Sequence, residues 1–149
     1  ASFGADYVPE SSIDGDLTFS RSSTPSSPST RYIAAYDDTF EHPANLAAAA
    51  GTYLGQAGVA SGIGPAILTA TSNGAVSGSA FDCTFDGTVT PRDGVDILDF
   101  AITFSGGGCP FETSTFVGFA RYDAGASEFL AFAVNASRTD SILFVGTRT

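Results

Sequence analysis

The chain of 149 residues contains no Lys, no Met and no Trp, and it has only one His, one Gln and two Cys. Without Lys, and with only four Glu, it lacks the Glu–Lys pairs that ordinarily support the exposed faces of helices. The single histidine, His42, precedes an Ala-rich stretch and is a poor base for a nucleophilic triad. We therefore expect few helices and no triad of this kind.

Basic residues are scarce as well. Six Arg stand against 12 Asp and 4 Glu, and the formal net charge is -10. A chain with this charge repels a phosphate backbone, so we expect no nucleic-acid partner. No apolar run continues for about 18 residues without Gly, Ser, Thr or Asn, the length that a membrane-spanning helix needs. The sequence therefore predicts no membrane span.

The residues that are abundant favour strands. Ser, Thr, Val, Ile and Phe replace the polar helix formers, and 17 Gly and 7 Pro interrupt the chain. With 13 Phe and 5 Tyr, a chain of this length can bury a single hydrophobic core. We expect an all-β protein.

The first 40 residues differ from the rest. We assign residues 1–40 to an extended N-terminal arm and residues 41–149 to a β-barrel domain. Ser20–Thr30 reads SRSSTPSSPST, a composition typical of a flexible or polyproline-like linker. Three short β-like pieces lie around it: Ser2–Val8, Asp16–Ser20 and Arg31–Tyr36. The arm residues that we expect to contact a partner are Tyr7, Val8, Leu17, Phe19, Tyr32, Ile33 and Tyr36.

One short helix is predicted after the arm. Pro43 stands at the first helical position, Ala44–Ala50 continues the helix, and Gly51 ends it. A helix of about two turns needs support from tertiary packing. His42, just before it, is interpreted as a capping or solvent-exposed residue.

From Thr52 onward, strands alternate with short turns. Asn73-Gly74 is a strong hairpin signal, and Pro91-Arg92-Asp93-Gly94 is a second turn. The clearest alternation places Leu98, Phe100, Ile102 and Phe104 on one face of a strand. The eight predicted strands are Thr52–Val59, Pro65–Ser72, Ala75–Phe81, Cys83–Thr90, Val95–Phe104, Thr115–Tyr122, Glu128–Ala136 and Ser141–Thr147. Such a meander closes into an antiparallel up-and-down barrel; a two-sheet β-sandwich is the alternative.

The two cysteines, Cys83 and Cys109, show neither a CxxC redox spacing nor the spacing of metal ligands. We expect them to form a disulfide that stabilises the fold by about 3–4 kcal/mol in the chain-entropy model; two buried free thiols are the alternative. The sequence begins with small residues and no Met, as after removal of a signal peptide. Export to an oxidising compartment, either extracellular or in the cell envelope, is therefore expected.

Two groups of motifs resemble known proteins. Gly51-Thr52-Tyr53-Leu54-Gly55, followed by Asn73-Gly74-Ala75-Val76-Ser77-Gly78, resembles the opening of small calycin-type barrels, which include the avidin and lipocalin groups. The resemblance implies a barrel, but avidin-like binders use Trp in the pocket. Biotin binding is therefore not implied for a chain that has no Trp.

A later set of segments is similar to uncharacterised bacterial secreted or lipoprotein domains. These segments are Cys83–Arg92, Gly118-Phe119-Ala120 and Val134–Asp140. The similarity implies export and an envelope or extracellular location, and no particular activity. The N-terminal cysteine of a lipoprotein is missing from the sequence given.

Several Asp residues are close together in the sequence. Asp93, Asp96 and Asp99, or the pair in Asp14-Gly15-Asp16, could supply oxygen ligands to calcium at a turn. Their spacing does not match an EF-hand, and solvated turn aspartates are the simpler interpretation. Asp82 and Asp86 could form a pair of carboxylates for glycoside hydrolysis, but no Trp platform accompanies them. We expect no enzymatic activity and no cofactor, with calcium as the one possible exception.

Two functional hypotheses remain open. Residues 43–81 carry no charge, which is typical either of a Ser/Thr/Gly-decorated wall or of a packing surface for another subunit. We expect a secreted structural or interaction protein whose arm pairs with a neighbour by strand addition and builds a fibre or layer. Its partner would be another copy or a different surface protein. The alternative is a lipocalin-like barrel that holds a small apolar ligand.

Overall fold

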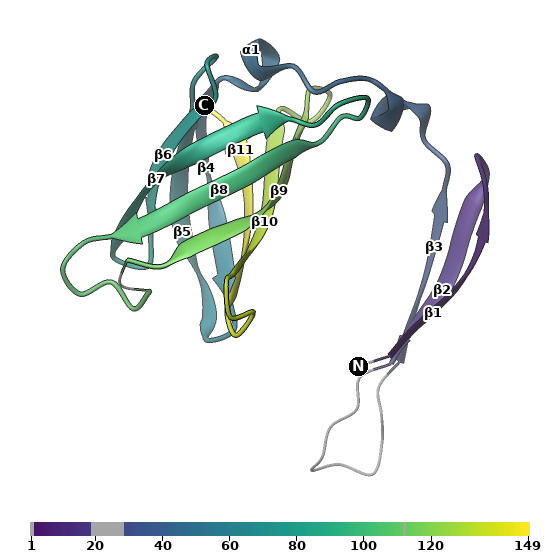
Figure 1. The fold of residues 1–149 in the computed structure, drawn as a ribbon, viewed down its shortest axis with the longest axis horizontal. Helices are drawn as coiled ribbons and strands as arrows, with labels where there is room; N and C mark the ends of the chain where they lie inside the picture. Colours follow the sequence, from purple (N-terminus) through teal and green to yellow (C-terminus); the bar gives the residue numbers. More distant parts are fainter. Residues whose placement is uncertain (1, 19–28, 112) are drawn as a thin grey trace, which may run out of the picture. The chain divides into compact units, whose positions relative to one another are not determined.

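The computed structural model describes residues 2–18, 29–111 and 113–149, and it divides into two compact units, residues 1–39 and 40–149 (Figure 1). The first unit is a three-stranded antiparallel sheet of β1 (Ser2–Val8), β2 (Ser12–Thr18) and β3 (Ser29–Ala35), in the order β1-β2-β3. The described parts of the three predicted pieces therefore lie in strands that pair with one another.

The second strand of this sheet begins earlier than predicted. Asp14-Gly15-Asp16 has the composition of a turn, yet it lies in the middle of β2. The chain turns before it, between Val8 and Ser12, where Glu10 adopts a positive φ of 51°. Strand pairing overrides the local turn preference of Asp and Gly here because β2 is bonded on both sides.

Two short helical turns follow β3. The first, η1 (Asp38–Glu41), spans the boundary between the two units, and the second, α1 (Leu46–Ala49), belongs to the second unit. The side chain of Asn45 caps α1 by accepting a hydrogen bond from the Ala48 N–H at 3.1 Å. The helix begins three residues later than predicted, because Asn45 and not His42 caps it, and it ends one residue earlier, because Ala50 is already extended and leads into the next strand.

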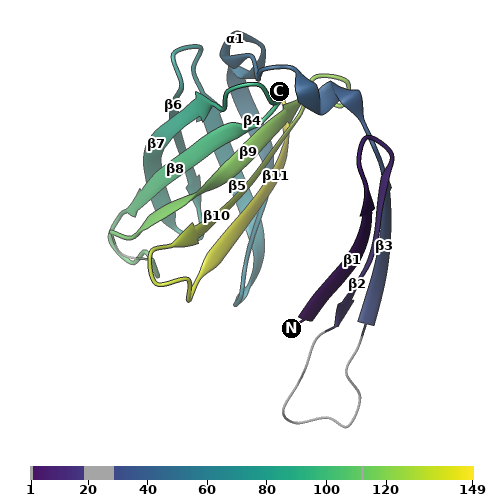
Figure 2. The ribbon, with the colours of Figure 1, turned by 45° about the vertical axis from the view of Figure 1, so that its right-hand side comes forward.

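Eight strands then form a closed antiparallel barrel, which confirms the predicted fold class and excludes the sandwich (Figures 1 and 2). Neighbours around the barrel follow the order β10-β11-β4-β5-β6-β7-β8-β9. The strands are β4 (Gly51–Val59), β5 (Gly62–Ala70), β6 (Ala75–Ala80), β7 (Cys83–Pro91), β8 (Leu98–Ser105), β9 (Thr115–Asp123), β10 (Glu128–Asn135) and β11 (Ser141–Arg148). Closure leaves no strand edge unpaired in the barrel.

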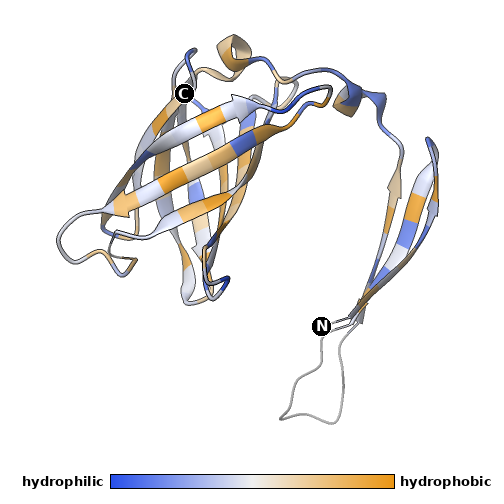
Figure 3. Ribbon diagram, in the orientation of Figure 1, coloured by the Kyte–Doolittle hydropathy of each residue, from blue (hydrophilic) through white to orange (hydrophobic). Residues whose placement is uncertain are grey.

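Hydrophobic and hydrophilic residues alternate along the barrel strands (Figure 3). In β8, Asp99 and Thr103 face outward. The residues predicted to face inward are buried: Leu98, Phe100, Ile102 and Phe104. Glycines occupy inward positions where neighbouring strands come close. A Cβ on Gly87 would lie 1.9 Å from the Ala101 carbonyl oxygen, and only Gly leaves room for this approach.

One end of the barrel is closed by a tyrosine and an arginine. The fully buried Tyr53 hydroxyl donates to the Ala49 carbonyl at 2.6 Å and accepts from Arg148 Nη2 at 2.9 Å. The Arg148 guanidinium also donates to the Ala48 carbonyl and lies 4.5 Å above the Tyr122 ring. Burial raises the pKa of Tyr53, and the Arg148 contact opposes this rise. These contacts join β4 and β11 to α1.

The opposite end is closed by the loop after β8. The predicted disulfide between Cys83 and Cys109 is confirmed and ties this loop to the start of β7. Phe111 of the same loop packs on Phe104 and Phe116, with ring centroids 4.9 and 5.7 Å apart. The disulfide therefore holds an aromatic cover over the core.

Candidate interaction surfaces and the barrel interior

The N-terminal sheet has two chemically different faces. The strand register places Ala5, Gly15 and Tyr32 side by side, so every second residue from these positions shares their face. The large side chains of this apolar face are Phe3, Tyr7, Ile13, Leu17 and Tyr32. The charged side chains of the opposite, polar face are Asp6, Asp14, Asp16 and Arg31. The sheet is amphipathic.

Aromatic rings cross the apolar face. Phe3 of β1 and Tyr32 of β3 stack with ring centroids 5.4 Å apart and an interplanar angle of 12°. They meet across Gly15 of the central strand, where a Cβ would lie 2.7 Å from Tyr32 Oη. This hydroxyl is buried and has no hydrogen-bond partner among the described residues. The missing side chain at position 15 makes the aromatic contact possible.

The apolar face is open to solvent on strand β1, whereas Ile13, Leu17 and Tyr32 are partly buried. Phe3 is 61% exposed and Tyr7 is 69% exposed. The buried hydrophobic cluster of the protein starts at Ala49 and draws no described member from residues 2–39. The stacked rings are therefore local contacts on a sheet without a core of its own.

An ion pair crosses the polar face. Arg31 Nε donates to Asp14 Oδ1 at 2.9 Å, and its Nη2 donates to Oδ2 at 2.5 Å. The hydrogen bonds from Arg31 lower the pKa of the Asp14 carboxyl. Because both side chains are well exposed, water screens the pair, and its contribution to stability is small.

Both outer strands of this sheet have an open edge. In the described part of the chain, β1 and β3 each pair with β2 alone. An unpaired edge presents N–H and C=O groups to any further strand. Strand addition can therefore take place at this sheet, whereas the closed barrel offers no edge.

The predicted contact residues of the arm are divided between the two faces. Tyr7, Leu17 and Tyr32 lie on the apolar face, whereas Val8 and Ile33 lie on the polar face. Tyr36 follows β3, and its N–H donates to the Ser11 carbonyl at 2.7 Å; Phe19 lies outside the described residues. The prediction missed Phe3 and Ile13. Alternation along residues 12–18 could have revealed Ile13.

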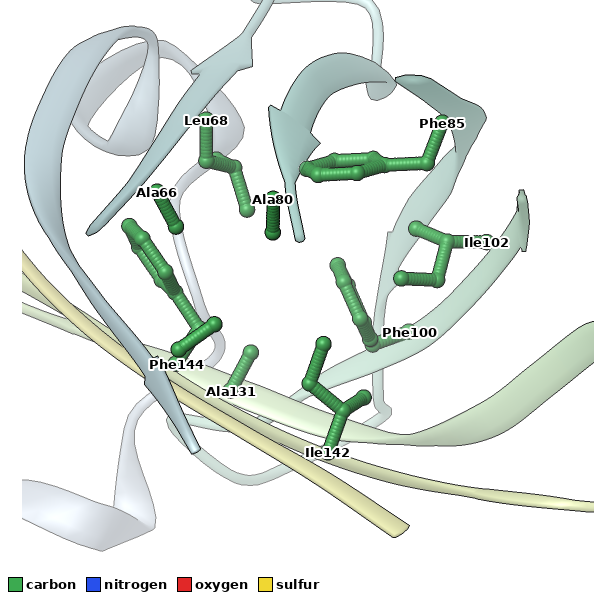
Figure 4. Close-up of a pocket in the computed structure, with 10 residues that line it drawn as sticks. Ala66, Leu68, Ala80, Phe85, Phe100, Ile102, Ala131, Ile142 and Phe144 are labelled. Atoms are coloured by element: carbon green, nitrogen blue, oxygen red, sulfur yellow. The ribbon is translucent and has the colours of Figure 1, made fainter. Parts of the chain in front are cut away.

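The barrel interior is filled by side chains. Phe85 and Phe100 enter the lumen from one side, and the ring of Phe144 lies on the opposite side beside Ala66 (Figure 4). They leave a cavity of about 10 Å³, which is apolar throughout. Its lining residues are Ala57, Ala66, Leu68, Ala80, Phe85, Phe100, Ile102, Ala131, Ile142 and Phe144. A space of this size is at most enough for one water molecule.

The three aspartates considered for calcium have separate surroundings. Asp96 receives a hydrogen bond from Arg121 Nε at 3.1 Å, and Asp99 forms an ion pair with Arg92. Asp93 lies in the turn between β7 and β8. Over the ranges that the structure describes, no group of three or more His, Cys, Asp or Glu side chains is placed to hold a metal ion.

The surfaces described above are the features of the molecule that bear on its function. None of the helices in the described ranges is long and apolar enough to cross a membrane. No family model, no curated protein and no solved structure matches the chain.

Proposed function

We propose that this chain is a structural subunit of an extracellular assembly, joined to its neighbours through the N-terminal sheet by strand addition. The observation that carries the proposal is that this sheet has uncovered edges and an uncovered apolar face. It has two open edges and an apolar face with side chains as exposed as Tyr7, at 69%. A sheet of this kind gains stability when another surface completes it.

The closed barrel restricts how strand addition can occur. Because all eight barrel strands are paired on both sides, the added strand must join another N-terminal sheet. Pairing of β1 with β3 of the next copy repeats head to tail and builds an open filament. Pairing of like edges instead closes a dimer. Main-chain hydrogen bonds would supply much of the affinity in both cases.

The chemistry of the chain agrees with an extracellular location. The Cys83–Cys109 disulfide is stable in oxidising compartments. The surface is acidic and free of Lys, which favours solubility of the subunits before they assemble. The proposal assigns no enzymatic reaction and no cofactor to the protein.

The ligand-carrier alternative receives less support. A small apolar ligand needs a pocket of about 300 Å³ or more, whereas the lumen leaves about 10 Å³. Binding would require Phe100 or Phe144 to leave the positions that fill the interior. We therefore favour the assembly function.

A charge on the sheet edge tests the proposal. Ile33 lies on edge strand β3, is 70% exposed and faces Asp14, so Ile33→Lys is compatible with the folded sheet. Edge charges oppose strand addition. We expect the concentration at which half of the protein is assembled to rise at least about tenfold, measured by light scattering after gel filtration.

Thr88→Lys is the matched control, because it adds the same charge at an exposed position of barrel strand β7. It should assemble as the wild type does. Removal of residues 1–39 should leave only monomers. If the Ile33→Lys protein assembled as readily as the wild type, strand addition at β3 would be wrong; if the truncated protein still assembled, the sheet would not be the connector.

A further inference from the structure

The outer surface of the barrel has two chemically different sides. The outward positions of β6, β7 and β8 are mainly Ser, Thr and Asp, as at Ser77, Thr88 and Asp99. Each of the other five adjacent strands carries at least one large apolar side chain at an outward position. We call this second side the apolar wall and define it by Leu54, Ile67, Val117, Phe119, Leu130 and Leu143.

The strand register makes this wall continuous across β9, β10 and β11, and again across β4 and β5. At the seam between these two parts, Leu143 is opposite Gly58 and Leu54 is opposite Thr147. Phe119 of β9 is opposite Phe132 of β10, which is in turn opposite Leu143 of β11. The rings of Phe119 and Phe132 are in contact, with centroids 5.8 Å apart. Across the seam between β4 and β5, Leu54 is opposite Ile67. Both belong to the uncharged stretch of residues 43–81.

The exposure of the wall suits an interaction surface. Its six defining side chains are between 40% and 58% exposed. Exposed apolar side chains gathered on adjacent strands commonly mark a binding site. The outward charged residues of these five strands lie at one end of the wall, at Arg121, Asp123 and Glu128. Leu54 and Ile67 lie at this same end, because Leu54 is opposite Thr147 and Thr147 is opposite Glu128.

We propose that the apolar wall is the docking site for the apolar face of the N-terminal sheet of a second copy. This inference rests on the proposed function and names the second surface of the assembly. Strand addition alone would join N-terminal sheets into a ribbon whose apolar face remained in water. The walls of the barrels supply the cover that this face lacks.

The dimensions of the two surfaces agree. Three strands of seven residues form a sheet about 14 Å wide and about 23 Å long, while the five strands of the wall span about 24 Å. The sheet therefore covers about three strands of the wall, with side chains interdigitating as in packed sheets. A thin sheet can also follow the convex barrel surface, which two barrels in contact cannot do.

The charges of the two units favour docking through the apolar face of the sheet. Residues 1–39 carry six acidic side chains and two Arg, and residues 40–149 carry ten acidic side chains and four Arg. Both units are acidic, so contact through the polar face of the sheet is disfavoured. The apolar face contains no charged residue in β1, β2 or β3. One sheet and one wall in each copy make the contact head to tail.

The test uses full-length chains that all carry Ile33→Lys, so that strand addition is suppressed. The wall variant adds Phe119→Lys and Leu143→Lys; position 119 is opposite Asp99, which accommodates the new charge. The face variant adds Phe3→Lys and Tyr7→Lys. A control adds Ser77→Lys and Thr88→Lys on the polar side of the barrel. Mass is measured by light scattering over a hundredfold range of concentration.

The Ile33→Lys protein and the polar-side control should still associate as concentration rises. The wall and face variants should each be monomeric alone, and their mixture should form one-to-one pairs, because one supplies the intact sheet and the other the intact wall. A far-ultraviolet circular dichroism spectrum and an unfolding curve verify that each variant retains its barrel.

Three results would overturn the docking proposal. The first is a wall variant that associates as strongly as the control. The second is a folded wall–face mixture that stays monomeric. The third is a monomeric Ile33→Lys protein together with a wall–face mixture that forms pairs. In that case, the wall would be covered by the sheet of its own chain. Failure of strand addition is recognised separately, by unchanged assembly of the Ile33→Lys protein relative to the wild type.

Discussion

The barrel and the N-terminal sheet use the same alternation of side chains but differ in closure. All buried hydrophobic residues of the described chain belong to the barrel unit, from Ala49 to Phe144. The N-terminal sheet has an apolar face of comparable composition, yet Phe3 remains 61% exposed. Alternation alone therefore does not produce a core. A core forms when the sheet closes or when another surface covers it.

Strand number explains this difference. Eight strands can curve until the first meets the last, and their inward side chains then fill the lumen. Three strands cannot close, so two edges and one apolar face remain available. The barrel holds the buried core of the protein, and we assign the contacts with other copies to the open sheet and to the apolar wall. Substitutions that separate these two roles test the comparison.

The largest contrast is expected between two phenylalanines, one in each unit. Phe104 is fully buried and contacts the rings of Phe85, Phe111 and Phe116. Phe104→Ala should lower the free energy of unfolding of the barrel by about 3–5 kcal/mol, because it removes buried contacts and leaves a cavity. Urea unfolding followed by near-ultraviolet circular dichroism measures this loss.

Phe3→Ala is the matched substitution in the open sheet. It should change the unfolding of the barrel by less than about 0.5 kcal/mol, as surface substitutions do. If Phe104→Ala also cost less than about 1 kcal/mol, the aromatic cluster at this end of the barrel would not hold the core together.

A second contrast concerns the disulfide. Replacing Cys83 and Cys109 by Ser should destabilise the barrel by about 3–4 kcal/mol, because the unfolded chain loses a loop constraint and the aromatic cover loses its attachment. The N-terminal sheet contains no cysteine, so its own structure should not change. Thermal unfolding monitors the barrel, and amide NMR signals of β1–β3 monitor the sheet.

Reduction of the wild-type protein with a thiol serves as the control and should lower stability to the level of the double Ser variant. A double variant as stable as the oxidised protein would mean that the loop containing Phe111 stays in place without a covalent link.

The barrel could be predicted because local signals and tertiary structure agree. Leu98 to Phe104 alternate with polar residues, and Asn73-Gly74 forms a turn between two strands. The predicted strand boundaries differ from the observed ones where the local composition favours a turn but strand pairing extends the strand. Gly62-Ile63-Gly64 lies outside the predicted strands, but it belongs to β5 because it pairs with the end of β4. Similarly, the predicted β-like piece begins at Asp16, whereas β2 begins at Ser12 and includes Asp14-Gly15.

The interaction surfaces could be predicted only in part. The contact of the N-terminal residues with a partner stays a prediction, and the sequence does not indicate that these residues pair into an amphipathic sheet. Phe119, Phe132 and Leu143 are far apart in the chain and become neighbours only through strand register. A shift of one residue would bury them instead. The apolar wall is therefore a property of the pairing, which single-strand patterns do not reveal.

The smallest expected effect is the acid titration of the polar face. Hydrogen bonds from Arg31 lower the pKa of Asp14 below its ordinary value of 3.8 in the folded sheet. The unfolded chain therefore takes up this proton first as pH falls. The pair stabilises the sheet fully above about pH 4, and this contribution is lost as pH falls through the folded pKa.

An NMR titration of the Asp14 carboxyl should give a midpoint below 3.8, and Arg31→Met should return it toward the ordinary value. Equal midpoints in the two proteins would show that the ion pair does not persist in solution, and the polar face would then owe its order to strand pairing alone.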